Sequence, residues 1–190
     1  MKVFKIANTE VTKDMRQKAK AVNFGIIYGQ GAWGLSNELG ITPSDAQLFI
    51  DEYFASFPGI KVFLESVVTD AVKEGYSKTI MNRRRYLPDL FSSNGNVRAF
   101  GERTAKNAPI QGSAADIIKK AMVDIDNVIE KKKLKSKLLI QVHDELIFNV
   151  PFDELEIMKK LVPEVMENTI KLLVPLKVDF DYGKNLYEMK

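Results

Sequence analysis

Residues 16–29 read RQKAKAVNFGIIYG and set a charged or aromatic side chain at every fourth position. At 3.6 residues per helical turn, steps of four keep such side chains on one slowly drifting stripe. The spacing predicts a helix over residues 13–28, with Thr12 as its N-cap and Gly29 just past its end. We call the set of four the basic-aromatic stripe: Arg16, Lys20, Phe24 and Tyr28.

The other side of this predicted helix is apolar. Val22, Ile26 and Ile27 lie off the stripe and can form the face that packs in a core. The stripe then remains available for another role. The same pattern also describes a solvated basic first turn followed by aromatic side chains that pack in a core, and the stripe alone leaves both interpretations open.

A second motif, QVHDEL at residues 141–146, sets two acids side by side between apolar runs. The β-prone runs 138–142 and 146–150 predict a hairpin whose tight turn carries Asp144 and Glu145. Two-residue turns favour Asn-Gly or Asp-Gly, so adjacent acids there break a local rule and indicate a divalent-metal site. Mg²⁺ takes hard oxygen ligands and completes its shell with water and substrate phosphate. With the basic-aromatic stripe, this turn suggests triphosphate and metal chemistry, and solvated turn acids are the alternative.

A third set of polar residues precedes the hairpin. Arg103, Asn107 and Gln111 are again four apart, and side-chain amides can donate to the acceptors of a nucleic-acid minor groove. Polar caps around Pro109 are the alternative. The only histidine, His143, would by itself be a half-buried strand residue more readily than a ligand or base.

Composition limits the class of protein. A chain of 190 residues with 45% hydrophobic and 28% charged residues can bury a core and has the balance of a soluble globular protein. It contains no cysteine, which excludes disulfides and cysteine-based metal sites and fits a reducing cytoplasm. No apolar run approaches the ~20 residues that span a bilayer, so we expect a cytoplasmic protein without membrane contact. The net charge of +3 is mild, but basic runs at 83–85 and 131–133 permit a polyanionic partner.

The order of the elements predicts an α+β fold. Four helices are expected in the first 75 residues, at 13–28, 32–39, 43–56 and 60–74, with Pro58-Gly59 as a turn. After a turn-rich stretch at 76–97, the helical pattern resumes and continues to residue 131. A break in this helix is expected near 107–110, because Pro109 lacks a backbone donor. The hairpin is followed by a helix with a capping-box-like start at Asp153 and Glu156 that reaches about residue 173, and a last strand at 176–180 completes the prediction.

Several motifs recur together in one known family. The pattern RxxxKxxxFxxxYG of the stripe is followed by NRRRYLPD at 82–89, NAPIQGSAADIIK at 107–119 and QVHDEL. In order and spacing they resemble the C-terminal polymerase region of the family A DNA polymerases, over essentially the whole chain. The resemblance implies that residues 1–78 are the fingers subdomain and 79–190 the C-terminal part of the palm, with a small antiparallel sheet and packing helices.

The resemblance also implies roles for the basic-aromatic stripe. Arg16 and Lys20 would hold the triphosphate of the incoming dNTP, and Lys20 would also give a proton to the departing pyrophosphate. Phe24 would pack at the sugar, and Tyr28 would close on the nascent base pair.

The remaining roles concern metal and DNA. Asp144 would be a metal-binding carboxylate, Glu145 an auxiliary acid beside the metal, and His143 a contact to the primer end. The residues that would read the minor groove of the primer-template are Arg103, Asn107 and Gln111. The implied reaction is phosphoryl transfer at a two-metal Mg²⁺ site.

Two parts of the family pattern have no counterpart in these 190 residues: a DYSQIELR-like strand that carries a further catalytic aspartate, and a histidine-bearing segment just before the nucleotide-binding helix. We therefore expect the C-terminal portion of a DNA-directed DNA polymerase, inactive until an N-terminal portion supplies that aspartate with the thumb and the rest of the palm. The alternative hypothesis is a stand-alone nucleotide- or DNA-binding module without catalysis.

Overall fold

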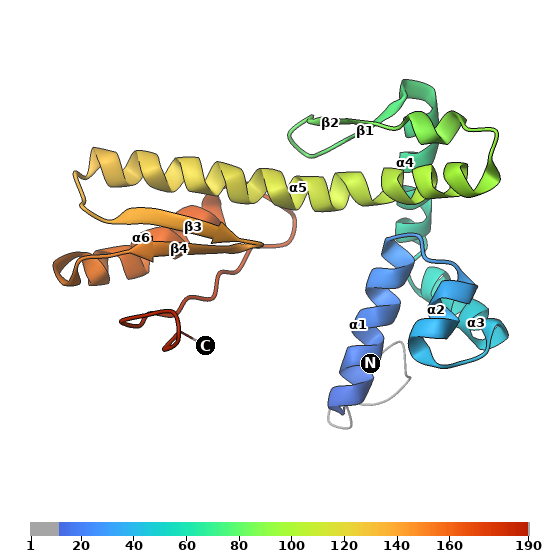
Figure 1. The fold of residues 1–190 in the computed structure, drawn as a ribbon, viewed down its shortest axis with the longest axis horizontal. Coiled ribbons are helices and arrows are strands. Elements are labelled where there is room, and N and C mark those ends of the chain that lie inside the picture. The colour runs from blue at the N-terminus through green and yellow to red at the C-terminus, as the bar shows by residue number, and fades with distance from the viewer. Residues whose placement is uncertain (1–11, 190) are drawn as a thin grey trace. The chain divides into compact units, whose positions relative to one another are not determined.

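The computed structural model describes residues 12–189, so the first eleven residues of the predicted fingers lie outside the described part. The described chain is mostly helical, with two small antiparallel sheets of two strands each (Figure 1). This confirms the predicted α+β class. Two compact units, Met1–Ser113 and Ala114–Lys190, divide the chain. The predicted boundary between fingers and palm at 78/79 is a division by role, and it stays a prediction.

The first unit begins with four helices. Their bounds are α1 Lys13–Ile27, α2 Ala32–Leu39, α3 Pro43–Ser56 and α4 Pro58–Glu74. Threonines are the N-caps of α1 and α3: Thr12 Oγ1 accepts from the Met15 N–H, and Thr42 Oγ1 accepts from the Asp45 N–H. The predicted turn at Pro58-Gly59 is wrong: Pro58 starts α4, where a missing N–H costs no helical hydrogen bond.

The core of these helices lies on the face that the sequence predicts. Val22 and Ile26 of α1 pack with Leu35 of α2 and with Ala46 and Tyr53 of α3. Tyr53 keeps its hydroxyl satisfied by donating to Asn23 Oδ1 at 2.7 Å, and burial raises the pKa of that hydroxyl. Ile27 is only half-buried. The core therefore holds α1 by the side opposite to its charged residues.

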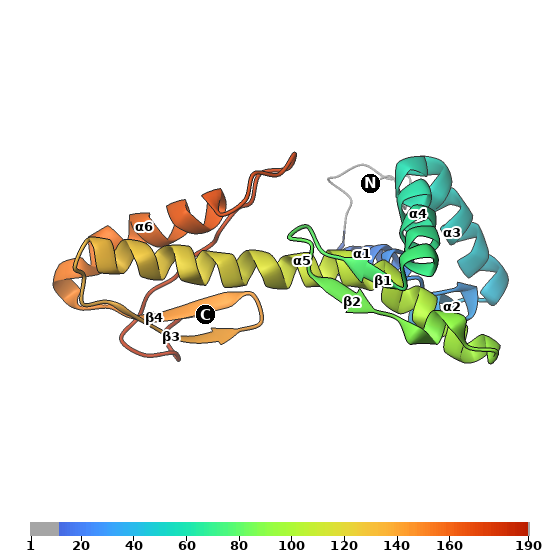
Figure 2. The same ribbon diagram turned by 90° about the horizontal axis from the view of Figure 1, so that it is seen from above.

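A β-hairpin and a long helix complete the first unit. Strands β1 Tyr76–Lys78 and β2 Arg84–Tyr86 pair antiparallel, the 3₁₀ turn η2 Pro88–Phe91 comes next, and α5 runs over Gly95–Lys131. Figures 1 and 2 both draw the hairpin alongside the first half of α5. The division between the two units falls within α5, after Ser113.

The predicted helix break near 107–110 is wrong, since α5 continues through Pro109. A proline at 109 cannot donate to the carbonyl four residues earlier, that of Ala105. The buried hydroxyl of Ser77 on β1 donates to this carbonyl instead, at 3.1 Å. The Ser113 hydroxyl also donates to the Pro109 carbonyl. The Ser77 side chain thus supplies the bond that the backbone lacks.

The second unit packs a hairpin and a helix against the end of α5. Strands β3 Lys137–Val142 and β4 Glu145–Asn149 pair antiparallel, followed by the 3₁₀ turn η3 Phe152–Glu154 and by α6 Leu155–Asn168. Ile125 and Ile129 of α5 and Met158 and Leu161 of α6 form the core, against which Leu146 and Phe148 of β4 pack. The predicted hairpin is confirmed.

Three predictions for the last third of the chain are wrong. The final helix ends at Asn168 rather than near 173, and it begins after η3 without a capping box. No strand forms at 176–180 in the described chain. A strand needs a neighbour to take its backbone hydrogen bonds, and here the Val178 N–H donates instead to Glu167 Oε1 at 3.2 Å. None of the described helices is long and apolar enough to cross a membrane.

Candidate functional site

The basic-aromatic stripe lies along the outward side of α1. Arg16 and Lys20 are exposed, Phe24 is 43% exposed and Tyr28 is half-buried. The rings of Phe24 and Tyr28 are 5.8 Å apart, and the Lys20 ammonium lies 5.8 Å from the centre of the Phe24 ring. A cation at this distance is attracted to the face of the ring, which restricts the lysine side chain. The stripe is thus a connected surface and not part of the core.

The end of α1 meets α5. Tyr28 is the C-cap, and Gly29 comes next with a φ of 77° that few residues other than glycine adopt. A Cβ atom at position 29 would lie 3.2 Å from Lys106 Cδ and 3.3 Å from Arg103 Cγ. Glycine therefore lets the chain turn while two cationic side chains of α5 lie against it. The aromatic end of the stripe and the first of the predicted minor-groove residues are neighbours within this unit.

The three predicted minor-groove residues succeed one another along α5. Arg103 and Gln111 are exposed and Asn107 is half-buried. The Arg103 guanidinium lies 6.0 Å from the Phe100 ring. The side-chain oxygen of Asn107 is buried and accepts no hydrogen bond from any described residue. A buried unsatisfied acceptor is costly, so Asn107 has hydrogen-bonding capacity that the described fold does not use.

The acidic turn differs by one residue from the prediction. Val142 pairs with Glu145, so the two-residue loop consists of His143 and Asp144, and Glu145 is the first residue of β4. His143 takes the positive φ of 53° that the first position of such a turn can need. Its carbonyl accepts from Gln141 Nε2 at 2.8 Å. The prediction of Asp144-Glu145 as the loop is wrong because the strand pairing, and not the charge, determines which residues turn.

All three side chains at the tip of this hairpin, His143, Asp144 and Glu145, are exposed. Across residues 12–189, no group of three or more His, Cys, Asp or Glu side chains could hold a metal ion. Two neighbouring carboxylates are nevertheless the hard oxygen donors that Mg²⁺ prefers, and it fills its other positions with water and phosphate oxygens. The residues present therefore fit a shared magnesium site and not a closed one.

A buried carboxylate fixes the approach to this hairpin. Glu154 Oε1 accepts from the Lys135 N–H at 2.7 Å, and Glu154 Oε2 accepts from the Ser136 N–H at 2.8 Å and from the Ser136 hydroxyl at 2.6 Å. The Lys135 backbone donor and the Ser136 hydroxyl hold the pKa of Glu154 below its ordinary value. The loop that leads into β3 is thereby anchored to η3.

Sequence reasoning missed Glu154, Ser77 and Lys106. Ser77 and Glu154 act on backbone groups 28 and 18 residues away, which no local pattern reveals. Lys106 could have been found, since it lies three residues after Arg103 and shares its side of the helix.

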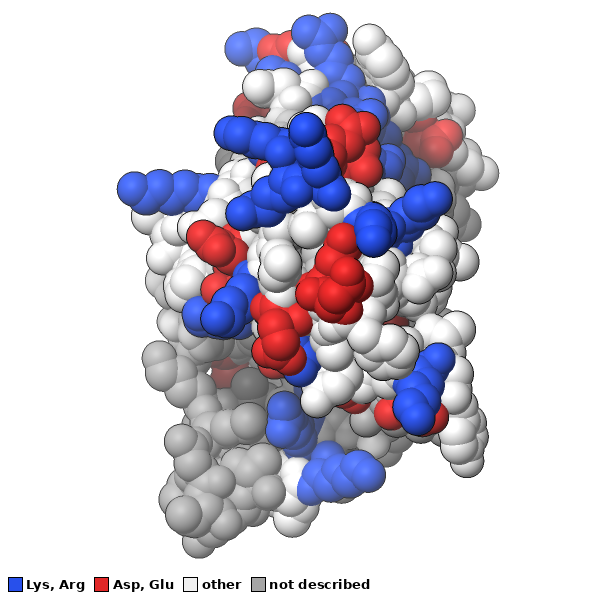
Figure 3. Space-filling view, turned by 90° about the vertical axis from the view of Figure 1, so that its left-hand side faces the viewer, with Lys and Arg blue, Asp and Glu red and all other residues white. Residues whose placement is uncertain are grey.

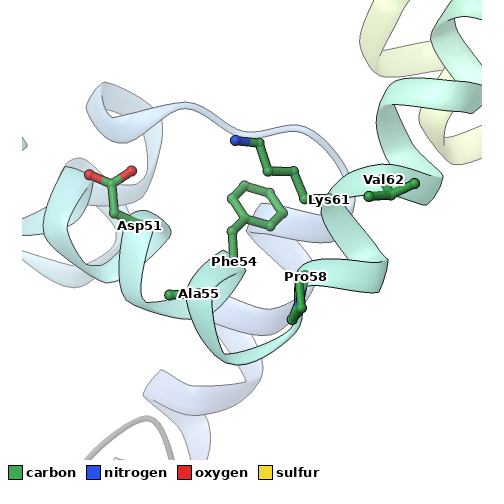
Figure 4. A pocket seen from close by; sticks show the side chains of 6 residues that line it. All are labelled: Asp51, Phe54, Ala55, Pro58, Lys61 and Val62. Carbon is green, nitrogen blue, oxygen red and sulfur yellow. The ribbon is translucent and has the colours of Figure 1, made fainter.

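Two other surface features of the described chain, a basic cluster and a hollow, do not resemble a catalytic site. Lys131, Lys132 and Lys133 at the end of α5 are exposed, and Figure 3, which views the side where α5 ends, shows Lys and Arg side chains gathered in its upper part. Figure 4 shows a hollow between α3 and α4 that none of the predicted site residues line. Its lining is Asp51, Phe54, Ala55, Pro58, Lys61 and Val62.

Comparison with known proteins gives one consistent result. The model of DNA polymerase family A matches residues 1–188. DNA polymerase I of Bacillus subtilis (strain 168) is 57% identical over the whole chain, and DNA polymerase I of Geobacillus stearothermophilus is 53% identical. The chain spans 22% of the length of each.

A solved structure is also similar. The chain resembles the POL domain of Pol1 from M. smegmatis, in complex with DNA primer-template and dNTP, with a TM-score of 0.89 and 46% identity. The match covers 93% of this chain and 31% of that one.

Proposed function

Because the chain belongs to DNA polymerase family A, we propose that it is the dNTP- and primer-template-binding portion of a DNA-directed DNA polymerase of the cytoplasm. One observation carries the proposal: the basic-aromatic stripe lies outside the core of α1, with both cations exposed and the lysine held against an aromatic ring. A surface of this kind is suited to a ligand with a charged phosphate end and a flat base. The relative solved with primer-template and dNTP supports the same ligands.

In this proposal the stripe binds the nucleotide from phosphate to base. Arg16 and Lys20 attract the triphosphate, and Lys20 provides the proton that the pyrophosphate takes as it leaves. Phe24 packs at the sugar, and Tyr28 lies at the nascent base pair. The Lys20 ammonium is already restricted by its contact with the Phe24 ring, so less side-chain entropy is lost when it binds a phosphate.

The same proposal assigns the DNA and metal contacts. The Asn107 amide reads the minor groove together with Arg103 and Gln111, by donating from its NH₂ group to acceptors on the base edges, and His143 contacts the primer end. Asp144 and Glu145 supply the carboxylate ligands on one side of the Mg²⁺ site. When bound, Mg²⁺ would activate the primer hydroxyl and neutralise the leaving group.

Primer extension tests the proposal. The chain would be combined with an N-terminal polypeptide that carries the remaining polymerase region of a close relative, and dNTP incorporation would be measured. We expect extension by the mixture and none by either part alone. The absence of extension by a folded mixture, with the intact relative active under the same conditions, would contradict it.

The alternative, a binding module without catalysis, has one observation in its favour. The described residues offer only a partial metal site. This alternative predicts salt-sensitive DNA binding by the chain and no extension in any mixture, so the same assay separates the two hypotheses.

A further inference from the structure

The β1–β2 hairpin has two faces of different character. Directly opposed residues of an antiparallel pair share a face, and successive residues alternate between faces. Tyr76 pairs with Tyr86, Ser77 with Arg85, and Lys78 with Arg84. Ser77 is buried and donates to Ala105 of α5, so its face is turned toward that helix. We call the opposite face, formed by Tyr76, Lys78, Arg84 and Tyr86, the outer face.

The outer face places two cations over one aromatic ring. The Arg84 guanidinium lies 4.8 Å from the centre of the Tyr76 ring, and the Lys78 ammonium lies 5.5 Å from it. The Tyr86 ring meets the Tyr76 ring edge-on at 5.7 Å and remains 69% exposed. One acid lies close, since the Tyr76 hydroxyl donates to Glu74 Oε2 at 3.1 Å. The Tyr86 ring and the two cationic side chains thus remain exposed to solvent.

The two cations have no acidic partner within the described chain. Neither Lys78 nor Arg84 forms an ion pair with any residue of 12–189. Arg85 beside them is also exposed. A concentrated positive charge that the fold does not neutralise favours a polyanion.

The hairpin is held in place on α5. Besides the Ser77 bond, the Ile80 N–H donates to Ser113 Oγ at 2.9 Å. A Cβ atom at Gly112 would lie 2.6 Å from Thr79 Cγ2, so only glycine allows this approach. An anchored platform loses little freedom when it binds a ligand.

We propose that the outer face binds a single-stranded segment of nucleic acid, with a base stacked on Tyr86 and phosphates at Lys78 and Arg84. Sequence-tolerant single-strand surfaces combine exposed aromatic rings with a positive surface along the backbone, as this face does. The site is distinct from the basic-aromatic stripe of α1 and from the minor-groove residues of α5. It therefore adds a contact that the proposed function does not require.

Fluorescence anisotropy with a labelled single-stranded oligonucleotide tests the assignment on the full chain. Tyr86→Ala should weaken binding about tenfold, as expected for loss of one stacked base, and Tyr86→Phe should bind as the unchanged protein does. The pair Lys78→Gln and Arg84→Gln should reduce the slope of log affinity against log salt by about 1.4. The matched control is Lys61→Gln with Lys73→Gln, which removes the same charge from exposed positions on α4.

Two further measurements make the outcome specific. Binding of a blunt duplex and of dNTP should be unchanged in the hairpin variants. The inference is overturned if the chain does not bind single strands, if Tyr86→Ala binds normally, or if the control weakens binding equally. It is also overturned if duplex binding falls as much as single-strand binding, because the face would then contact duplex backbone.

Discussion

Among single residues, Lys20 is one whose environment limits its motion. Its ammonium lies over the Phe24 ring while remaining exposed. If Lys20 donates a proton to pyrophosphate, Lys20→Ala in the completed polymerase should slow single-turnover incorporation by a factor of about 10² to 10⁴. Lys73→Ala removes an equal charge from α4 and should leave the rate unchanged. A full rate in the Lys20 variant would rule out its proposed role.

Ser77 allows a sharper test at the same scale, because it compensates for a specific missing donor. Ser77→Ala leaves the Ala105 carbonyl buried without a partner, which should lower the free energy of unfolding by about 1–3 kcal/mol. Pro109→Ala restores a backbone N–H for this carbonyl. When Pro109 is already alanine, the Ala105 carbonyl no longer depends on the serine. Ser77→Ala should then lower the free energy of unfolding much less than it does in the unchanged protein.

Urea unfolding of the four proteins in this cycle measures the coupling. Ser66→Ala is a suitable control, since its hydroxyl also donates to a helical carbonyl, that of Phe63, but at an exposed position. Equal losses from Ser77→Ala in the presence and absence of Pro109 would refute the explanation of the unbroken helix.

At the scale of elements, the approach to the acidic hairpin depends on one ionised carboxylate. The pKa of Glu154 is lowered below 4.5, first by the Lys135 N–H and then by the Ser136 hydroxyl. A depressed pKa means that the folded state holds the proton less tightly than the unfolded state. The stabilisation is therefore present above pH 4.5 and is lost as the pH falls through the lower, folded-state value.

Glu154→Gln should accordingly remove part of the decline in unfolding free energy below pH 4.5, and it should lower stability at about pH 7. Urea unfolding across this range, with Glu164→Gln on α6 as an exposed control, measures both effects. Identical pH profiles for the Glu154 variant and the unchanged protein would mean that the anchor contributes nothing.

The elements also show where sequence reasoning succeeds. The first three helices and the hairpin of the second unit have their signals within a few residues: threonine caps, a proline at the first helical position, and β-prone runs around a turn. The failures depend on distant partners. Pro109 stays helical because Ser77 bonds the carbonyl that the proline leaves, and at residues 176–180, which form no strand, the Val178 N–H donates to the side chain of Glu167.

The same distinction holds for the candidate site. The i, i+4 spacing correctly predicts that Arg16, Lys20 and Phe24 share one exposed side of α1. It cannot predict that Gly29 brings this helix against Arg103 and Lys106, because those residues are distant in the sequence. Nor can composition decide that His143, rather than Glu145, belongs to the turn.

For the whole molecule, binding and chemistry should be separable. Asp144→Asn removes a proposed metal ligand from an exposed turn, so the chain should keep its stability, its dNTP affinity and its DNA affinity. In the completed polymerase the same change should reduce incorporation on the order of 10³-fold, equivalent to several kcal/mol of transition-state stabilisation. Asp153→Asn, an exposed acid of the same unit, is the control. Normal incorporation by the Asp144 variant would mean that the acidic turn is not the metal site.

The proline of α5 also affects where the β1–β2 hairpin lies along this helix. In the interior of an ordinary helix every carbonyl is equivalent to its neighbours, and a hairpin lying alongside could shift by one turn without losing a bond. In α5, Pro109 leaves one interior carbonyl that needs an outside donor, and Ser77 is that donor. Together with the Ile80–Ser113 bond and the close approach at Gly112, the proline therefore sets the register of hairpin against helix, and with it the spacing between Tyr86 and the amides of Asn107 and Gln111.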